Sequence, residues 1–408
     1  MDAEQLERTY RDEATRLRAT LARRIGDVGI AEELVQDAFV EALEHWPHEG
    51  VPANPGGWLT TTAWRKAIDR QRRAMAGHEK LELLAVSQTR AGLTADTAAE
   101  PAAEQDDDLL SLVFACCHPA LPADSQVALT LRTVCGLTTS EIAAAFLVSE
   151  QTMGQRLSRA RRSLRDAGVV VRIPDPDDLG QRLAAVLEVV YLVFNEGYLA
   201  SAGVSPARRD LAAQALSLAR LLHRLMPREP EVLGLSALLM LHESRALARF
   251  DGWGRLVRLA EQDRSRWDRD SAAEATKLLD RAIALRRAGP YQVQAAIAAL
   301  HAAAPDYGKT DWRQIRMLYD RLFEMTPSPV VQLNRAVATR FAVGAEAALA
   351  EVEPLASDLD SYRLFHAVRA ELLAALGRPA EARAANERAL ALAANPAERE
   401  LIARRLTS

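Results

Sequence analysis

One stretch near the middle of the chain restricts the fold more than any other. It reads TTSEIAAAFLVSEQTMGQRLSRARRSLR and covers residues 138–165. Thr139 is placed to cap a short helix, and Ser149 is placed to cap a second helix after a tight turn. Two short helices joined in this way form a helix-turn-helix. The spacing predicts that these residues are buried: Ile142, Ala143 and Phe146 on the first helix, and Met153, Leu157, Ala160 and Leu164 on the second.

The exposed face of the second helix has the chemistry of a DNA-reading helix. Residues 149–165 contain five arginines, although the formal net charge of the whole chain is −4. Polar side chains at the start of such a helix can reach base edges in the major groove, and arginines can bind phosphates. A solvated basic face is the alternative, but the capping, the turn and the arginine placement together favour DNA. The residues expected to contact DNA are Gln151, Thr152, Gln155, Arg156, Arg159 and Arg162.

The composition predicts that the rest of the chain is also helical. Apolar residues make up 49% of the sequence and aromatic residues only 5%, and Ala and Leu occur throughout. A chain of 408 residues is too long for one ordinary core, so we expect two or three domains of helices packed on helices. No apolar run approaches the roughly 18 residues that span a bilayer, and the charged start is unlike a signal sequence. We therefore expect a cytoplasmic protein without a membrane segment.

An acidic segment precedes the helix-turn-helix. Residues 31–46 read AEELVQDAFVEALEHW, and no Lys or Arg occurs from Val28 to Glu49. The helical spacing predicts a core stripe and, beside it, an acidic edge that would repel DNA and attract a basic protein. The stripe comprises Leu34, Ala38, Phe39, Ala42, Leu43 and Trp46, and the edge comprises Glu33, Asp37 and Glu41.

A basic segment follows the acidic one. Residues 58–73 read WLTTTAWRKAIDRQRR and combine cations with one internal aromatic residue, Trp64. Cations bind phosphate, and an aromatic face can receive a base removed from the duplex. Burial of Trp64 in a core is the alternative. The residues expected to contact single-stranded DNA here are Trp64, Arg65, Lys66, Asp69, Arg72 and Arg73.

In chain order, the three segments resemble the polymerase-binding, promoter-melting and minus-35-reading parts of an extracytoplasmic-function sigma factor of the sigma-70 family. The resemblance covers about residues 5–170. It implies that the acidic edge lies toward core RNA polymerase, that residues 64–73 meet the melted minus-10 strand, and that residues 151–162 enter the minus-35 groove. Trp64 departs from the pattern, because a smaller or basic residue is expected there.

The resemblance also divides the chain. It implies sigma region 2 in residues 1–82, a flexible acidic linker in 83–108 and sigma region 4 in 109–172. About 25 extended residues reach roughly 80 Å, which is enough to join promoter elements roughly 70 Å apart. The acidic end of the linker, EQDDD, resembles linkers that similar sigma factors thread through the polymerase RNA channel. A plain solvated tether is the alternative.

The remaining residues, 173–408, predict a large helical extension. Two segments align with Gly344 and Gly377 in register, a period of 33 residues that is close to the tetratricopeptide repeat. Together with VVYLVFNEGY (residues 189–198) and LAEQDRSRWD (residues 259–268), they resemble the sigma factor subgroup with a tetratricopeptide-like C-terminal extension. We expect the extension to control the sigma part in cis and to bind a regulatory protein or a ligand; a passive scaffold is the alternative. The residues expected at a possible interdomain contact are Asp263, Arg264, Arg266, Trp267 and Asp268; structural packing of the segments 189–198 and 259–268 is the alternative.

The sequence does not predict an enzyme. Cys116, Cys117 and His118 contain potential metal ligands, but zinc sites generally use spaced cysteines, so buried packing is the expectation. We expect no catalytic residue, metal or cofactor. Two functions remain: a promoter-specificity subunit of RNA polymerase, and a stand-alone helix-turn-helix regulator whose extension senses a ligand or protein. The acidic edge favours the first function, because a stand-alone regulator has no need of it.

Overall fold

The computed structural model describes residues 3–76, 102–146, 148–199 and 207–407. These residues are mainly helical, and their one β-bridge is an isolated pair, Phe250 and Leu256. The predicted all-α fold is therefore confirmed. None of the described helices is long and apolar enough to cross a membrane. The chain forms two compact units, Met1–Val189 and Val190–Ser408.

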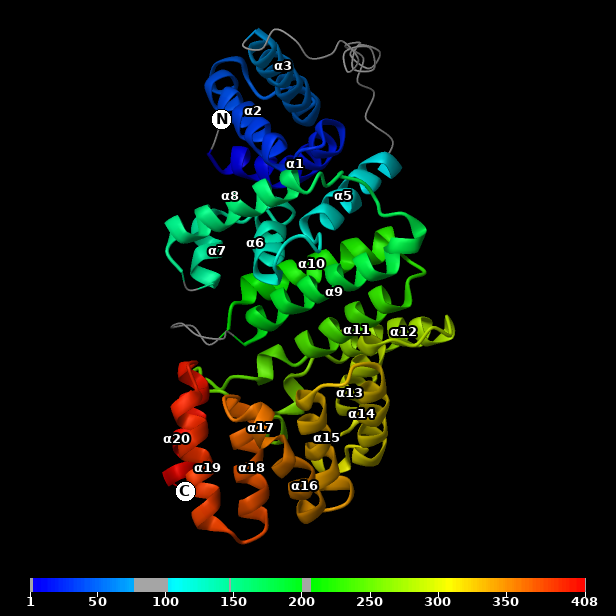
Figure 1. Ribbon diagram of the computed structural model, residues 1–408, viewed down its shortest axis with the longest axis vertical. Coiled ribbons are helices and arrows are strands. Elements are labelled where there is room, and N and C mark those ends of the chain that lie inside the picture. Colours follow the sequence, from blue (N-terminus) through cyan, green and yellow to red (C-terminus); the bar gives the residue numbers. More distant parts are fainter. Residues whose placement is uncertain (1–2, 77–101, 147, 200–206, 408) are drawn as a thin grey trace. The chain divides into compact units, whose positions relative to one another are not determined.

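Unit 1 holds the three segments that the sequence analysis singled out (Figure 1). Helix α1 packs against α2, α3 and α5 and so joins the first three helices to the group that follows. Within that group, α6 packs against α7 and α8, and α7 packs against α8. The helices of unit 1 are α1 (Ala3–Ile25), α2 (Val28–Glu49), α3 (Pro55–Ala76), α5 (Ala102–Cys116), α6 (Ala123–Thr133), α7 (Thr139–Ala145), α8 (Glu150–Asp166) and the first part of α9 (Pro176–Tyr198).

Local capping explains where the two helices of the helix-turn-helix begin. The Ser149 hydroxyl accepts a hydrogen bond from the backbone N–H of Thr152 at 3.1 Å, so the predicted cap of α8 is confirmed. The cap of α7 is Thr138 rather than the predicted Thr139. Its hydroxyl accepts from the backbone N–H of Glu141 at 3.1 Å, while the Glu141 carboxylate accepts from the backbone N–H of Thr138 at 2.7 Å. This reciprocal pair is a capping box.

The acidic linker expected over residues 83–108 is helical from Ala102 onward. Its last residue, Asp108, is only 5% exposed and accepts hydrogen bonds from Thr20 at 2.8 Å and Arg23 at 2.6 Å, both on α1. These contacts with α1 give a physical reason for an ordered helix at this point. Residues 77–101 lie outside the described residues, so a flexible linker there stays a prediction.

Unit 2 is a series of helices in which chain neighbours pack on one another (Figure 1). Contacts join α13 to α14, α14 to α15, α15 to α16, α18 to α19 and α19 to α20. Beyond the end of α9, its α-helices are α10 (Arg209–Leu225), α11 (Pro230–Glu243), α12 (Arg269–Ala284), α13 (Pro290–Ala303), α14 (Trp312–Met325), α15 (Pro329–Ala342), α16 (Ala345–Val352), α17 (Ala356–Leu359), α18 (Arg363–Ala375), α19 (Pro379–Leu392) and α20 (Pro396–Thr407). Short 3₁₀ helices lie between them: η2 (Ala246–Ala248), η3 (Leu259–Glu261), η4 (Arg264–Arg266), η5 (Tyr307–Lys309) and η6 (Glu353–Leu355).

Gly344 and Gly377 occupy equivalent turns, the first between α15 and α16 and the second between α18 and α19. Their φ angles are +144° and +70°, a conformation that side chains strongly disfavour. A Cβ at either position would have no atom within 4 Å. Each glycine is thus required by the conformation of its turn. A tetratricopeptide-like arrangement of these hairpins stays a prediction.

Close helix packing does occur at Gly197, in the NEGY part of the segment 189–198. A Cβ on Gly197 would lie 2.2 Å from the backbone nitrogen of Ala212 and 2.9 Å from the carbonyl oxygen of Arg208. The backbone N–H of Arg208 also donates to the Gly197 carbonyl at 2.9 Å. The end of α9 and the start of α10 can therefore approach this closely only without a side chain at position 197.

We predict that Gly197→Ala lowers the free energy of unfolding of the extension by about 1–3 kcal/mol, because the methyl group must displace backbone. Gly252→Ala is the matched control, since a Cβ at Gly252 would have nothing within 4 Å. Urea denaturation followed by circular dichroism measures both changes. Equal stability of the two variants would contradict the close approach of α9 and α10.

Candidate DNA and polymerase interfaces

The exposed face of α8 carries five of the six residues that were expected to read DNA. The opposite face is buried and consists of Met153, Leu157, Ala160 and Leu164, as predicted. Gln151, Thr152, Gln155, Arg159 and Arg162 are exposed. Arg156 differs, because its side chain is only 24% exposed, its guanidinium lies 5.2 Å from the Phe146 ring, and its Nη1 lies 3.6 Å from the Asp124 carboxylate. The face open to a ligand is therefore formed by the other five residues.

The acidic edge on α2 faces the basic helix α3. Glu41 forms ion pairs with Arg65 and with Lys66, the latter at 2.9 Å, and Glu33 pairs with Arg70. The hydrogen bond from Lys66 holds the pKa of Glu41 below its ordinary value, against the raising effect of partial burial. Helix α2 itself carries no Lys or Arg, but its packing on α3 brings three cationic side chains to the acidic edge. Asp37, which is exposed, forms no ion pair with any described residue.

The other predicted minus-10 residues also lie on α3. Trp64 is partly buried, and the guanidinium of Arg24 lies 5.8 Å from its ring centroid, so it is neither a core residue nor fully exposed. Asp69 and Arg72 are exposed and lie 4.0 Å apart. The side chain of Arg73 lies outside the described residues. The structure therefore places these residues on one helix and leaves their contacts with DNA as a prediction.

An apolar strip on α2 was missed by the sequence analysis. Val40 is 53% exposed and Leu43 is 52% exposed. Leu43 was expected in the core stripe, but that prediction is wrong, because Ala42 and Trp46 are the buried residues on this part of the helix. Val40 and Leu43 follow Asp37 at helical spacings, so the surface beside the unpaired carboxylate is apolar.

Comparisons with known proteins agree with this arrangement. Residues 9–76 match Sigma-70 region 2, residues 111–164 match Sigma-70 region 4, and residues 182–283 match a family of unknown function (DUF6596). The chain is 27% identical over 161 residues to the ECF RNA polymerase sigma factor SigK of Mycobacterium ulcerans (strain Agy99), which covers 38% of this chain and 82% of that protein.

It belongs to the extracytoplasmic-function sigma factors, in a form with a C-terminal extension. As a sigma factor it is a non-enzymatic factor of transcription initiation, with core RNA polymerase and promoter DNA as partners. It is also 48% identical over 380 residues to the uncharacterized protein R00370 of Rhizobium meliloti (strain 1021), across 93% of this chain and 89% of that one. That similarity therefore extends through the extension. No solved structure matches the chain.

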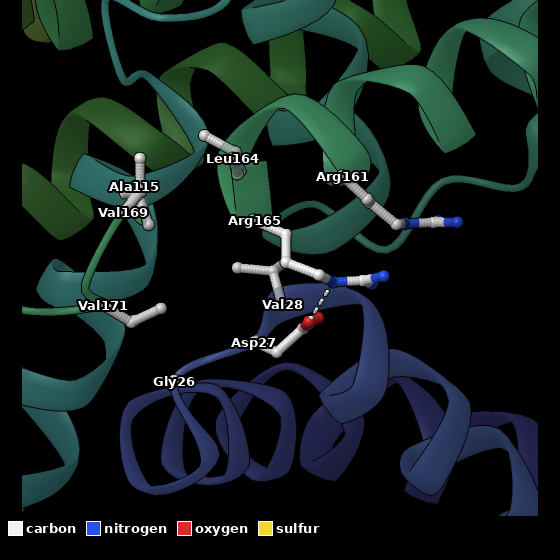
Figure 2. A pocket seen from close by; sticks show the side chains of 9 residues that line it. All are labelled: Gly26, Asp27, Val28, Ala115, Arg161, Leu164, Arg165, Val169 and Val171. Atoms are coloured by element: carbon white, nitrogen blue, oxygen red, sulfur yellow. Dashed lines mark hydrogen bonds and ion pairs between the residues drawn. The ribbon is translucent and has the colours of Figure 1, made fainter. Parts of the chain in front are cut away.

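Region 2 and region 4 of this sigma factor are joined by a buried carboxylate. Glu32 on α2 is 5% exposed and forms ion pairs with Arg132 of α6, at 2.6 Å, and with Arg161 of α8. Beside it, Asp27 pairs with Arg165 of α8 at 2.7 Å, as Figure 2 shows. We call these three ion pairs the Glu32 interface. Two of the five arginines of α8 thus bind region 2.

Asp27 has two roles at this interface. Its carboxylate caps α2 by accepting from the backbone N–H groups of Gly29 at 2.8 Å and Ile30 at 2.9 Å. Burial would raise the pKa of Asp27, but the Ile30 hydrogen bond and the Arg165 side chain together hold that pKa below its ordinary value. Asp27 therefore stays ionised at neutral pH and keeps Arg165 in place.

Helix α1 adds hydrogen bonds to the end of α6. The Thr15 hydroxyl donates to the carbonyl of Val134 at 3.2 Å, and the buried Arg18 donates to the carbonyl of Thr133. These donors satisfy carbonyl groups that a helix leaves unpaired at its C-terminus. Region 2 thus completes the hydrogen bonding of a region 4 helix.

The packing around the Glu32 interface is incomplete. A narrow recess, partly open to solvent, lies between the start of α2 and the end of α8. Figure 2 shows Asp27 and Arg165 on facing sides of this recess, which is also lined by Val28, Leu164 and Val171. Ion pairs and buried apolar side chains, among them Val28 and Leu164, therefore meet at this interface.

The cysteines are packed in region 4. Cys116 and Cys117 are buried, as predicted, and burial raises the pKa of both thiols, that of Cys117 to about 12. The described residues contain no group of three or more side chains suited to bind a metal ion.

The segment 259–268 stabilises unit 2 itself. Arg264 donates to the carbonyls of His301 and Ala304, both at 2.5 Å, at the end of α13. Asp268 caps α12 through the backbone N–H of Ser271 at 3.0 Å, and Asp263 accepts from the backbone N–H of Ser265 at 2.9 Å. Trp267 is buried, whereas Arg266 is exposed. The bonds described for this segment lie within unit 2, and a contact of the segment with the sigma regions stays a prediction.

We predict that Glu32→Gln lowers the free energy of unfolding of the sigma regions by about 3 kcal/mol, because it leaves Arg132 and Arg161 without their buried partner. Glu33→Gln is the control: the Glu33 side chain is 59% exposed and pairs with Arg70 at the surface, so the loss stays within about 1 kcal/mol. Urea unfolding curves measure both values. A loss no larger for Glu32→Gln than for Glu33→Gln would show that the buried carboxylate does not stabilise this unit.

Proposed function

We propose that this sigma factor binds core RNA polymerase through α2, contacts the melted minus-10 element through α3 and reads the minus-35 element with α8, under control in cis by the extension. The face of α8 carries the proposal for DNA. Its first turns expose Gln151, Thr152 and Gln155, and its next turns expose Arg159 and Arg162. Amides suit base edges and guanidinium groups suit bases or phosphates in a major groove.

The surface of α2 supports the polymerase contact. Asp37 is exposed and unpaired among the described residues, and the exposed Val40 and Leu43 follow it on the helix. A carboxylate beside apolar area fits a protein partner that offers basic and apolar groups. The same surface is a poor match for DNA, because it adds negative charge and apolar area.

The ion pairs between α2 and α3 support a link between polymerase binding by α2 and contact with the minus-10 strand by α3. Glu41 holds Arg65 and Lys66, two of the residues proposed to meet the minus-10 strand. These pairs are largely at the surface, where an ion pair is worth about 1 kcal/mol or less. Phosphates can therefore replace the Glu41 carboxylate at little cost, and polymerase binding to α2 would favour that exchange.

The spacing of the promoter elements requires the Glu32 interface to open. A compact unit of about 190 residues is roughly 40 Å across, whereas the two elements lie roughly 70 Å apart. Regions 2 and 4 must therefore separate before both can bind. The ionic character of the interface and the recess beside it both favour separation once polymerase offers other partners.

Helix α9 supports control in cis. The boundary between the two units falls inside this helix, and the match to DUF6596 begins in it at residue 182. Arg182 donates to the carbonyl of Phe114, in the region 4 match, at 2.6 Å. A change in the extension that bends or shifts α9 would therefore act on region 4. A passive extension is the competing possibility.

We predict that two substitutions separate the activities. Asp37→Lys weakens binding to core polymerase, because it reverses the unpaired charge on α2. Arg159→Ala leaves core binding unchanged and weakens promoter binding of the holoenzyme by about 1–3 kcal/mol if the contact is to a base. Titration of core polymerase and transcription in vitro from a cognate promoter measure these effects.

The control for both substitutions is Arg172→Ala, which removes an exposed arginine of unit 1 that pairs with Asp175. It leaves both activities unchanged. Unaltered core affinity in Asp37→Lys removes α2 from the polymerase contact. Tight and specific promoter binding without core polymerase would instead identify a stand-alone regulator.

We predict that removal of the extension after Val189 changes the rate of transcription in vitro severalfold. This end point keeps the Arg182 bond to Phe114, which truncation near residue 172 would lose. Circular dichroism verifies that the truncated protein stays folded. A folded truncated protein that transcribes at the full-length rate would contradict control in cis; a gain identifies an inhibitory extension, and a loss identifies an activating one.

A further inference from the structure

Unit 2 contains a polar recess near the end of the segment 189–198. The recess is narrow, with enclosed space for about one water-sized group, and the rest of it is open to solvent. The end of α9, the start of α10, the end of α11 and η2 with the residues after it form its wall. The lining residues with polar side chains are Tyr198, Arg209, Glu243 and Arg249.

Arg249 is an unusual lining residue. It is only 9% exposed, yet its guanidinium forms no hydrogen bond or ion pair with any described residue, and its Nε is buried without a partner. The guanidinium lies 3.5 Å from the centroid of the Tyr198 ring. The ring thus covers one face of the cation, while its buried Nε–H is left without an acceptor among the described residues. A buried charge in this state is strongly unfavourable unless a partner is added.

A second unpartnered donor lies in the same recess. The Tyr198 hydroxyl is buried and has no hydrogen-bond partner among the described residues. Buried tyrosine hydroxyls normally find a partner. Two buried donors at one recess lack acceptors among the described residues. This indicates that an acceptor from outside those residues binds in the recess.

The neighbouring charges leave the recess positive. Arg209 and Arg249 line it together with one carboxylate, Glu243. Glu243 acts on both arginines only at longer range, and burial raises its pKa. Glu398, which also acts on Arg249 at a distance, is engaged by Arg363 at 2.8 Å. Residues 200–206 contain no Asp or Glu and so have no side chain that can supply the missing carboxylate.

We propose that this recess binds the oxyanion of a small molecule, a carboxylate or phosphate group, with Arg249 and Tyr198 as its donors. Guanidinium groups bind both kinds of oxyanion through charge-assisted hydrogen bonds. The recess accepts only a small group, so a folded protein partner cannot reach the Arg249 and Tyr198 donors. This site goes beyond the proposed function, because its occupation is measurable without polymerase or DNA.

The test uses the full-length protein with inorganic phosphate and, separately, acetate, at constant ionic strength. Calorimetric titration and thermal unfolding report binding, since a ligand of the native state raises Tm. We expect at least one of the two anions to bind, and to bind about tenfold or more weakly to Arg249→Met. Arg255→Gln is the matched control, because Arg255 already pairs with Asp251 at 2.7 Å, and it binds the anion as the unaltered protein does.

The stability of Arg249→Met without an anion separates a ligand-binding role from a structural one. Removal of an unpartnered buried charge leaves Tm unchanged or raises it, whereas removal of a structural arginine lowers it. Tyr198→Phe retains the ring beneath the guanidinium and removes only the hydroxyl, so its Tm stays unchanged while the anion binds more weakly. No binding of either anion, equal binding by all variants, or a fall in Tm of both Arg249→Met and Tyr198→Phe would overturn the proposal.

Discussion

The buried carboxylate of Glu32 sets the arrangement of the sigma regions. It pairs with Arg132, whose Nη1 donates to the carbonyl of Leu137 at 3.0 Å, directly before the helix-turn-helix. It also pairs with Arg161 on α8, the second helix of the helix-turn-helix. One side chain of region 2 therefore orients both the entry to the helix-turn-helix and its second helix. Burial of the Glu32 carboxylate is strongly unfavourable unless Arg132 and Arg161 pair with it. Burial of Glu32 in region 2 therefore depends on the presence of region 4 at the interface.

This interface divides the arginines of α8 by role. Arg161 and Arg165 face region 2 carboxylates, and Arg156 lies against Phe146 and Asp124. Arg159 and Arg162 remain exposed. A single amphipathic helix thus presents one basic edge to its own chain and leaves another exposed. The arginines proposed to bind DNA are therefore not those that bind region 2.

Local sequence rules predicted the parts of the structure that depend on local contacts. The buried stripe of α8 and its Ser149 cap follow from helical periodicity and a hydroxyl at the first turn. The same periodicity wrongly predicted that Leu43 is buried, because it does not show which side of the apolar face packs against another helix. The partners of Glu32 and Glu41 lie 24 to 129 residues away in sequence, and only the packing of helices brings them together. The Gly26-Asp27 pair is typical of a helix start, but nothing in the neighbouring sequence predicts that Asp27 also pairs with Arg165.

The extension is connected to the sigma regions through α9, because the boundary between the two units falls inside this helix. Near its start, Arg182 bonds to a region 4 carbonyl, and at its end Gly197 and Tyr198 form part of the polar recess. A ligand in the recess can alter region 4 only if it binds two states of the extension with different affinity. Gly197 lines the recess at the point where α9 most closely approaches α10, so any such difference in affinity would depend on the packing of these two helices.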